Sequence, residues 1–386
     1  MLAKEFWTPE DQEYCVQIRR RIHRRPELGF DLPETSALVK EELTAMGLTW
    51  TDKYAPCSVV AFVNPEQQGK TVLIRADMDA LPVLEKSGEP FASEIEGRMH
   101  ACGHDAHTAI LLTLGRVLLR AKAQLKCRVM LLFQPSEECA DSGAKCMVEN
   151  GVCEGVDYAI TFHCGNEHPA GYLGVVEGGY CAACDPISLT FHGKTAHATL
   201  YWEGVDALGM ALEAWDGLQK IVAEEVGDRE HIFWLGYLHG GTAHNVVSDE
   251  CNMKISFRYY DKDFAAKVRT RGIALLEELA QRKGGTIDID WRTSAPAVIN
   301  DPALTRAFEA AAQKVAPGNC GLTEAGMGSE DFAWFVTKVP GIATRLGTGN
   351  PEKGITALGH TNNYRIDESA FQNGVLGLAQ FVLDMA

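Results

Sequence analysis

Short apolar segments alternate with helical segments along most of this chain. The runs at 72–76, 129–133 and 158–162 are mostly apolar, and the stretch at 105–121 has the length and apolar content of a buried helix. Strands that alternate with helices in this way build a sheet with helices packed on its faces. The first part of the chain is therefore predicted to be an α/β domain with a largely parallel sheet.

This alternation stops near residue 184 and resumes near residue 297. Between these points the pattern predicts strands and helices in the order βαββαβ, which is enough for a self-contained unit. The simplest arrangement is a small domain inserted into a larger one. We predict a larger α/β domain built from 1–183 and 297–386, and an inserted βαββαβ domain at 184–296.

The composition argues against several classes of partner. The chain has 386 residues and a formal net charge of −16, so it lacks the basic face that a nucleic-acid-binding protein needs. No apolar run reaches the roughly 18 residues that a membrane span requires. The N-terminus has no basic flank followed by an apolar stretch, which a secretion signal would have. We therefore expect a cytoplasmic protein with reduced cysteines and with no nucleic-acid or membrane partner.

Potential metal ligands follow several of the predicted strands, at the sheet edge where α/β proteins bind ligands. In the segment at 99–107, Cys102 and His104 flank Gly103, which lets the backbone turn so that both side chains face one point. Thiolate and imidazole are good ligands for zinc-like ions. Without a metal, the same segment is interpreted as a polar loop that caps the next helix through Asp105.

A pair of carboxylates follows the predicted strand at 129–133. Glu137 and Glu138 are unfavourable side by side unless something stabilises their charges. A metal centre would do so, with one carboxylate binding the ion and the other serving as general base. The alternative is the acidic first turn of a helix that Ser136 caps.

Three further positions point to a metal only in combination. His163 directly follows the predicted strand at 158–162, His360 stands in a loop before the final helix, and Asp79 follows the strand at 72–76. Taken alone, each histidine is more simply a structural residue, and the acidic pair Asp77 and Asp79 is a turn or an orienting group for a ligand histidine. Because all these groups fall at one predicted sheet edge, together they favour a metal centre.

The sequence resembles the metallo-amidohydrolase family that includes indoleacetyl-amino-acid hydrolases, hippurate hydrolases, N-acetyl-diaminopimelate deacetylases and aminobenzoyl-glutamate hydrolases. It is more distantly similar to aminoacylase and carboxypeptidase G. The matching stretches cover nearly the whole chain in family order, and Met-His-Ala-Cys-Gly-His-Asp at 99–105 is very specific to this group. The other matching stretches are 23–30, 75–82, 134–138, His163, 193–198 and 328–332.

The resemblance implies a divalent metal centre, with one or two ions per subunit. The implied metal ligands are Cys102, His104, Glu138, His163 and His360. Glu137 would be the catalytic carboxylate, and Asp79 would orient the site. Zinc or manganese is the expected metal, and such mixed ligands also admit nickel or cobalt. The implied reaction is hydrolysis of the amide bond of N-acyl or N-aroyl amino acids, in which Glu137 removes a proton from a metal-activated water.

The amino-acid part of such a substrate carries a carboxylate, so the site should offer it a hydrogen-bond donor. Arg258 is the best candidate, since a guanidinium matches a carboxylate with two parallel hydrogen bonds, and Asn245 is the next. Both resemble substrate-contacting positions of the family's smaller domain, and Gly328 and Ser329 belong to a matching stretch of the larger one. Without a substrate role, Arg258 would be a solvated strand arginine and Asn245 a turn residue.

The inserted domain resembles the family's dimerisation unit, so we expect a homodimer through this domain, and an open edge strand offers a physical route to pairing. His197 matches a family histidine that reaches toward an active site, in some relatives that of the neighbouring subunit, and that stabilises the oxyanion. Relatives usually have a proline soon after this histidine. This chain has Thr199-Leu200-Tyr201-Trp202 instead, which bears on the loop's shape and on substrate choice.

Three alternative functions remain open. A dipeptidase or aminopeptidase on the same fold would need an acidic group for a free amine, and none is identified in the sequence. A catalytically silent binding module would have lost Glu137 or a ligand, and none is missing. A cysteine-nucleophile hydrolase would use Cys102 with a histidine, and a chelator would separate it from a metal enzyme.

Overall fold

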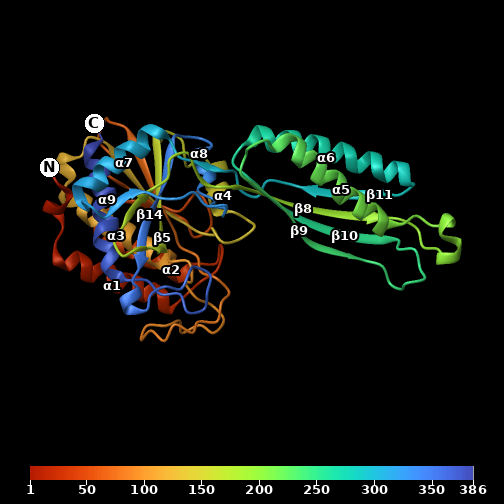
Figure 1. The fold of residues 1–386 in the computed structure, drawn as a ribbon. Helices are drawn as coiled ribbons and strands as arrows, with labels where there is room; N and C mark the ends of the chain where they lie inside the picture. Colours follow the sequence, from red (N-terminus) through yellow and green to blue (C-terminus); the bar gives the residue numbers. More distant parts are fainter. Residues whose placement is uncertain (386) are drawn as a thin grey trace. The chain divides into compact units, whose positions relative to one another are not determined.

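The computed structural model describes residues 1–385, which form two compact units (Figure 1). The first unit comprises Met1–Tyr180, Val298–Ala325 and the chain from Asp331 onward, and the second comprises Cys181–Ala297 with Gly326–Glu330. The predicted domain boundaries include 326–330 in the larger domain. In the structure this segment packs with the second unit, because Gly326 bridges to Cys181 and the carbonyl of Gly328 accepts the N–H of Ala182 at 2.9 Å.

The first unit is built on a mixed sheet whose strand order is β1-β2-β4-β3-β5-β14-β6-β13. The central neighbours β4, β3, β5 and β14 are parallel, whereas β2 and β6 run antiparallel to β4 and β14. The strands are β1 (Trp50–Thr51), β2 (Val59–Val63), β3 (Thr71–Asp77), β4 (Arg128–Gln134), β5 (Tyr158–Pro169), β6 (Leu173–Val175), β13 (Cys320–Leu322) and β14 (Gly341–Gly349). A separate short pair joins β7 (Gly179–Cys181) to β12 (Val298–Ile299).

Helices and short 3₁₀ turns pack around this sheet. The α-helices are α1 (Pro9–Arg24), α2 (Pro33–Ala45), α3 (His104–Arg120), α4 (Gly143–Glu149), α7 (Pro302–Val315), α8 (Ala333–Val336) and α9 (Phe371–Asp384). Short 3₁₀ turns are η1 (Ala3–Phe6), η2 (Lys122–Gln124), η4 (Pro351–Lys353) and η5 (Glu368–Ala370). Helix α3 lies between the sheet and the helices α1 and α9, while α4 packs with α8 (Figure 1). This central position explains why α3 is buried on nearly all sides.

The second unit is an antiparallel sheet of order β11-β8-β10-β9 with two helices. Its elements in chain order are β8 (Ala183–His192), η3 (Ala198–Glu203), α5 (Ala207–Val226), β9 (His231–Gly240), β10 (Glu250–Tyr259), α6 (Lys262–Lys283) and β11 (Thr286–Trp291). Buried and more exposed residues alternate along β8 and β10, so one face of the sheet carries α5 and α6 and the other stays open.

The predicted fold class, a largely parallel α/β domain with an inserted βαββαβ unit, is confirmed. Each unit has a hydrophobic core of its own: the first gathers around β3, β4, α3 and α9, and the second lies between the antiparallel sheet and α5 and α6. Among the helices of residues 1–385, none is both long and apolar enough to cross a membrane.

Candidate metal centre

The five side chains expected as ligands converge in the first unit, and we call them the donor cluster: Cys102, His104, Glu138, His163 and His360. The donor atoms of Cys102, His104 and His163 lie within 4.8 Å of one another, and so do those of Cys102, Glu138 and His360. Sγ of Cys102 lies 3.4 Å from Nε2 of His163, and Oε1 of Glu138 lies 3.2 Å from Nε2 of His360. Cys102 belongs to both groups.

Two histidines of the donor cluster have Nδ1 engaged and direct Nε2 toward it. Nδ1 of His104 donates to the carbonyl of Asp79, and Nδ1 of His163 donates to the carbonyl of Cys164, each at 2.8 Å. A carbonyl only accepts, so the neutral ring carries its proton on Nδ1 and leaves Nε2 bare. Nε2 of His104 is also buried without a hydrogen-bond partner. Buried polar atoms are normally paired, and this atom fits a divalent cation.

The charges around His104 favour a positive charge at this point. Burial lowers the pKa of His104, but the nearby Asp77 and Cys102 outweigh burial and raise it well above its usual value. Oδ2 of Asp77 lies 3.6 Å from Nε2 of His104, and Oε2 of Glu137 lies 4.0 Å from the same atom. An environment that stabilises a proton here also stabilises a metal ion in its place, since the two compete for one nitrogen.

Asp79 connects three segments of the cluster. Its two carboxylate oxygens accept the backbone N–H groups of Glu137 and Glu138 at 2.9 and 3.1 Å, and its backbone carbonyl accepts the proton of His104. The residue itself is buried. It therefore holds the loop after β3, the loop after β4 and the start of α3 in one arrangement.

The interpretation of Glu137 and Glu138 as a capped helical turn is wrong. Both residues lie in a loop, and α4 begins only at Gly143, with Ser142 as its N-cap. Ser136 has a φ of 55°, a conformation that a non-glycine residue adopts only when the surrounding structure holds it there. The two carboxylates therefore project from a constrained loop rather than from the first turn of a helix.

The alternative in which Asp105 caps the helix is wrong as well. The N-cap of α3 is Gly103, whose φ of 89° is left-handed, and Asp105 lies inside the first turn. Its carboxylate instead accepts from Arg19 at 2.8 Å and from His23 at 2.7 Å, both on α1. This buried contact anchors the beginning of α3, where His104 stands, to α1.

His163 does not follow a strand, as the sequence predicted, but lies within one. β5 continues to Pro169 because its pairing with β14 extends past His163 to Gly349. The neighbouring strand β3 stops pairing with β5 at Thr161, so His163 still emerges beyond the end of β3.

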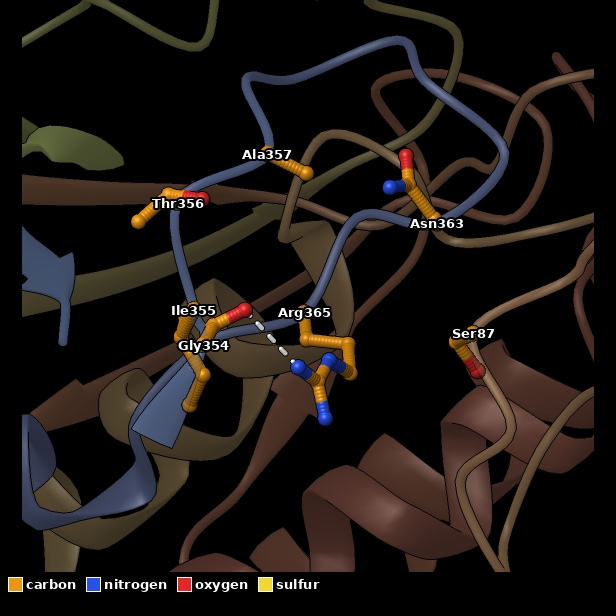
Figure 2. A pocket seen from close by; sticks show the side chains of 7 residues that line it. All are labelled: Ser87, Gly354, Ile355, Thr356, Ala357, Asn363 and Arg365. Atoms are coloured by element: carbon orange, nitrogen blue, oxygen red, sulfur yellow. Dashed lines mark hydrogen bonds between the residues drawn. The ribbon is translucent and has the colours of Figure 1, made fainter. Parts of the chain in front are cut away.

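His360 completes the donor cluster from an exposed loop with a positive φ of 66°. The same loop lines a polar pocket with Ser87 (Figure 2). In that pocket Arg365 donates to the carbonyl of Gly354 at 2.8 Å, and it lies 3.5 Å from Glu89. The guanidinium therefore braces the loop that carries His360. None of the donor-cluster side chains lines this pocket, so it is distinct from the candidate metal site.

The cysteine-nucleophile alternative finds no support in the environment of Cys102. Burial raises the pKa of its thiol, although the adjacent His104 acts in the opposite direction. The net shift opposes the thiolate that such a nucleophile requires.

The other predicted positions belong to the second unit. Arg258, on β10, donates to the carbonyl of Met327 at 2.9 Å, next to the exposed Gly328 and Ser329. Asn245 is exposed, and its carbonyl accepts the N–H of Ala198 at 2.9 Å. His197 is the N-cap of η3, and its Nδ1 accepts the N–H of Thr199 at 3.3 Å. A neutral His197 therefore carries its proton on Nε2.

Comparison with known proteins identifies the family. The chain matches the model of peptidase family M20/M25/M40 over residues 73–384. It belongs to that family. The M20 chain is 32% identical over 374 residues to the thermostable carboxypeptidase 2 of Saccharolobus solfataricus, covering 96% of this chain and 95% of that protein. It is 33% identical over 367 residues to the N-acetyl-L-cysteine deacetylase of Bacillus subtilis, covering 93% and 85%.

A solved structure agrees with this assignment. The crystal structure of the Bacillus subtilis YXEP protein, described as a dinuclear metal-binding peptidase of the M20 family, superposes with a TM-score of 0.84 at 29% identity, covering 97% of this chain and 98% of that one. The resemblance stated from the motifs is confirmed. This M20-family protein is a metal-dependent amidohydrolase.

Asp77 was named in the sequence only as a turn or orienting residue, and the residues around it, His107, Arg75, Gln134 and Asp331, were given no role there. Asp77 accepts from His107 at 2.5 Å and from Arg75 at 2.5 Å, and Arg75 also donates to Gln134 at 2.8 Å and to Asp331 at 2.7 Å. All five are buried. A charged residue inside the apolar run at 72–76 was the available signal, because a buried arginine needs several acceptors.

Proposed function

We propose that this M20-family enzyme hydrolyses the amide bond of N-acyl or N-aroyl amino acids, releasing a carboxylic acid and a free amino acid. The observation that carries the proposal is the position of Glu137. Its carboxylate lies 4.0 Å from the bare Nε2 of His104, while Asp79 holds its backbone N–H. A carboxylate beside a cation site is placed to exchange a proton with water. The similarity to an N-acetyl-L-cysteine deacetylase supports this class of substrate.

The donor cluster would hold one or two divalent ions, zinc or manganese first and nickel or cobalt next. One ion fits Cys102, His104 and His163, and the other fits Cys102, Glu138 and His360. Sulfur, nitrogen and carboxylate oxygen together suit these metals better than calcium or magnesium, which prefer oxygen alone. A bound ion would acidify water and polarise the amide carbonyl.

The chain's own residues would then move the proton. Glu137 takes a proton from the attacking water and passes it to the leaving amine nitrogen, so the same carboxylate serves as base and then as acid. His197 has a role at the amide oxygen: because its Nδ1 accepts from Thr199, its Nε2–H is free to donate to the developing oxyanion. Asp79 bonds to the backbone of Glu137 and Glu138 and to the ring of His104, so it fixes their positions relative to one another.

The amino-acid half of the substrate ends in a carboxylate, which Arg258 would bind, with Gly328 and Ser329 next to its partner Met327. Asn245 is the other candidate donor, and it lies between β9 and β10, at the end of β10 opposite to Arg258. Arg258 is held at one end by the carbonyl of Met327, and its guanidinium has further N–H groups to offer. A carboxypeptidase acting on peptides is the second candidate function, favoured by the similarity to a thermostable carboxypeptidase. Both reactions release an amino acid with a free carboxylate. A hydrolysis screen of N-acetyl, benzoyl, indoleacetyl and aminobenzoyl amino acids against peptides separates them.

The test of the catalytic assignment is Glu137→Gln. This change keeps the shape of the side chain and removes its ability to take a proton. We expect turnover of the best substrate in that screen to fall by at least about 10²-fold, with metal content measured by elemental analysis unchanged. Glu149→Gln, at an exposed position of α4, is the control and should behave as the wild type. Near-normal turnover of Glu137→Gln would reject Glu137 as the base.

We also propose that the enzyme forms a homodimer through the second unit. Strand β9 is one of the two outer strands of the antiparallel sheet, so its outer edge is open to pairing. It also exposes apolar side chains, among them Ile232, Trp234 and Tyr237.

A further inference from the structure

We propose that His107 is a positioning residue for His163: acting through the backbone of Cys164, it sets the orientation in which His163 presents Nε2 to the donor cluster. The inference rests on the proposed role of His163 as a metal ligand. It goes further by assigning a function to a buried histidine that is neither a ligand nor a catalytic group.

The hydrogen bonds of His107 determine its tautomer. Nε2 accepts the backbone N–H of Cys164 at 2.9 Å, and a backbone N–H only donates. The proton of the neutral ring is therefore on Nδ1, which donates to Oδ1 of Asp77 at 2.5 Å. The donor atoms of His107, Asp77 and His104 lie within 4.8 Å of one another, as in a metal site. Since both nitrogens of His107 are already engaged, the residue supports the cluster instead of binding an ion.

Cys164 transmits the position of His107 to His163. The N–H that His107 holds belongs to the peptide bond joining His163 to Cys164, and the carbonyl of Cys164 accepts the Nδ1 proton of His163 at 2.8 Å. The two rings also touch edge to face, with centroids 4.9 Å apart. With Nδ1 held in this way, Nε2 of His163 lies 3.4 Å from the sulfur of Cys102.

Asp77 is held in a fixed position, and it thereby fixes the position of His107. Its other oxygen accepts from Arg75, a fully buried guanidinium that also bonds to Gln134 and Asp331. A buried ionic group of this kind persists only when its partners are fixed around it. Asp77 ends β3, Gln134 ends β4 and His163 lies on β5, so the network ties together neighbouring strands of the sheet.

Two substitutions of His107 separate the two bonds that it makes. In His107→Gln, the side-chain carbonyl reaches the place of Nε2 and accepts the N–H of Cys164. In His107→Asn, the shorter amide donates to Asp77 from the place of Nδ1 but does not reach Cys164. If His107 acts through Cys164, Gln retains its function and Asn does not. If His107 merely fills space, the two variants should differ only in stability.

The measurement is titration of the metal-depleted full-length protein with Co²⁺. It follows the thiolate-to-cobalt absorption from Cys102 and the ligand-field bands that report the geometry. We expect His107→Asn to weaken cobalt binding about 10- to 100-fold, as loss of a ligand's supporting hydrogen bonds does, and to shift the ligand-field bands. His107→Gln should keep affinity and spectrum near wild type. Thr113→Val, at another buried polar position of α3, is the control and should leave the spectrum unchanged.

The outcomes distinguish this inference from the proposed ligand set. Wild-type cobalt binding in His107→Asn would overturn the positioning role, and so would equal weakening in His107→Asn and His107→Gln. His163→Ala serves as the reference. If it lowers cobalt binding while His107→Asn does not, only the positioning role is lost. If His163→Ala itself binds cobalt as the wild type does, the ligand assignment fails and the inference with it.

Discussion

Each histidine near the candidate metal centre is suited to a role that depends on what its second nitrogen contacts. In His104 and His163, Nδ1 donates to a carbonyl and Nε2 is left for an ion. In His107, Nε2 accepts from a backbone N–H and Nδ1 donates to Asp77, so no nitrogen remains to bind an ion. Residue type and spacing in the segment at 99–107 do not distinguish these cases, because the distinction lies in contacts with residues distant in the chain.

Arg258 is the residue whose predicted role is easiest to isolate. If it binds the substrate's carboxylate, Arg258→Ala should raise KM by about tenfold or more, the value of a charge-assisted hydrogen bond, and change kcat less. Steady-state kinetics on the preferred substrate measures both constants. Lys254→Ala is the control, because Lys254 lies on the same strand and the same face as Arg258. Unchanged KM and kcat in Arg258→Ala would remove it from the substrate site.

At the scale of single elements, loops rather than strands give the candidate metal centre its shape. The strands end near one another as the sequence predicted, but the loop after β4 and the loop that carries His360 both contain positive-φ residues. These loops stay in place through side-chain contacts at their bases. For Glu137 and Glu138 the contact is with Asp79, and for the His360 loop it is with Asp367.

Asp367 closes the base of the His360 loop. Its carboxylate accepts from Asn350 at 2.5 Å, from Lys353 at 2.9 Å and from the N–H of Ser369 at 3.1 Å. Burial raises the pKa of Asp367, but these hydrogen bonds outweigh burial and lower it from 3.8 to about 2. A carboxyl whose pKa is lower in the folded state stabilises the fold above its unfolded pKa. That stability is lost as the pH falls through the folded value.

We therefore expect Asp367→Asn to lower the free energy of unfolding by about 2 kcal/mol near neutral pH. The difference from the wild type should shrink as the pH falls from about 4 to about 2. Urea denaturation over that range measures it. Asp52→Asn, which breaks an exposed pair with Lys40, is the control and should have little effect. A difference that stays constant with pH would contradict the assigned role of Asp367.

At the scale of the whole molecule, the second unit offers a surface that a single chain does not cover. Strand β9 is an outer strand, and its side chains opposite Arg258, Ser256 and Lys254 are Ile232, Trp234 and Tyr237. Trp234 is 68% exposed, which is unusual for a tryptophan. Exposed aromatic residues on an open strand are typical of an interface between subunits.

Trp234→Lys should therefore weaken homodimer formation by more than about tenfold, since a central aromatic residue of an interface contributes about 2 kcal/mol or more. Sedimentation velocity over a range of concentrations measures the dissociation. Leu212→Lys is the control: Leu212 is 52% exposed on α5, which packs on the opposite face of the same sheet. A wild-type protein that stays monomeric at all concentrations would contradict the proposed dimer.

The sequence by itself determined the elements and the kinds of donor atom. Apolar periodicity placed β3, β4 and α3 within a few residues, because it reflects burial along the chain, although β5 continues well past its predicted end. The motif around Cys102 and His104 indicated the family. The tertiary structure decided which side chains meet. It brought Arg75, Asp77 and His107 behind the donor cluster, and it held Glu137 and Glu138 in a loop instead of a helix. These outcomes depend on hydrogen bonds between residues far apart in the chain, and no local pattern records such bonds.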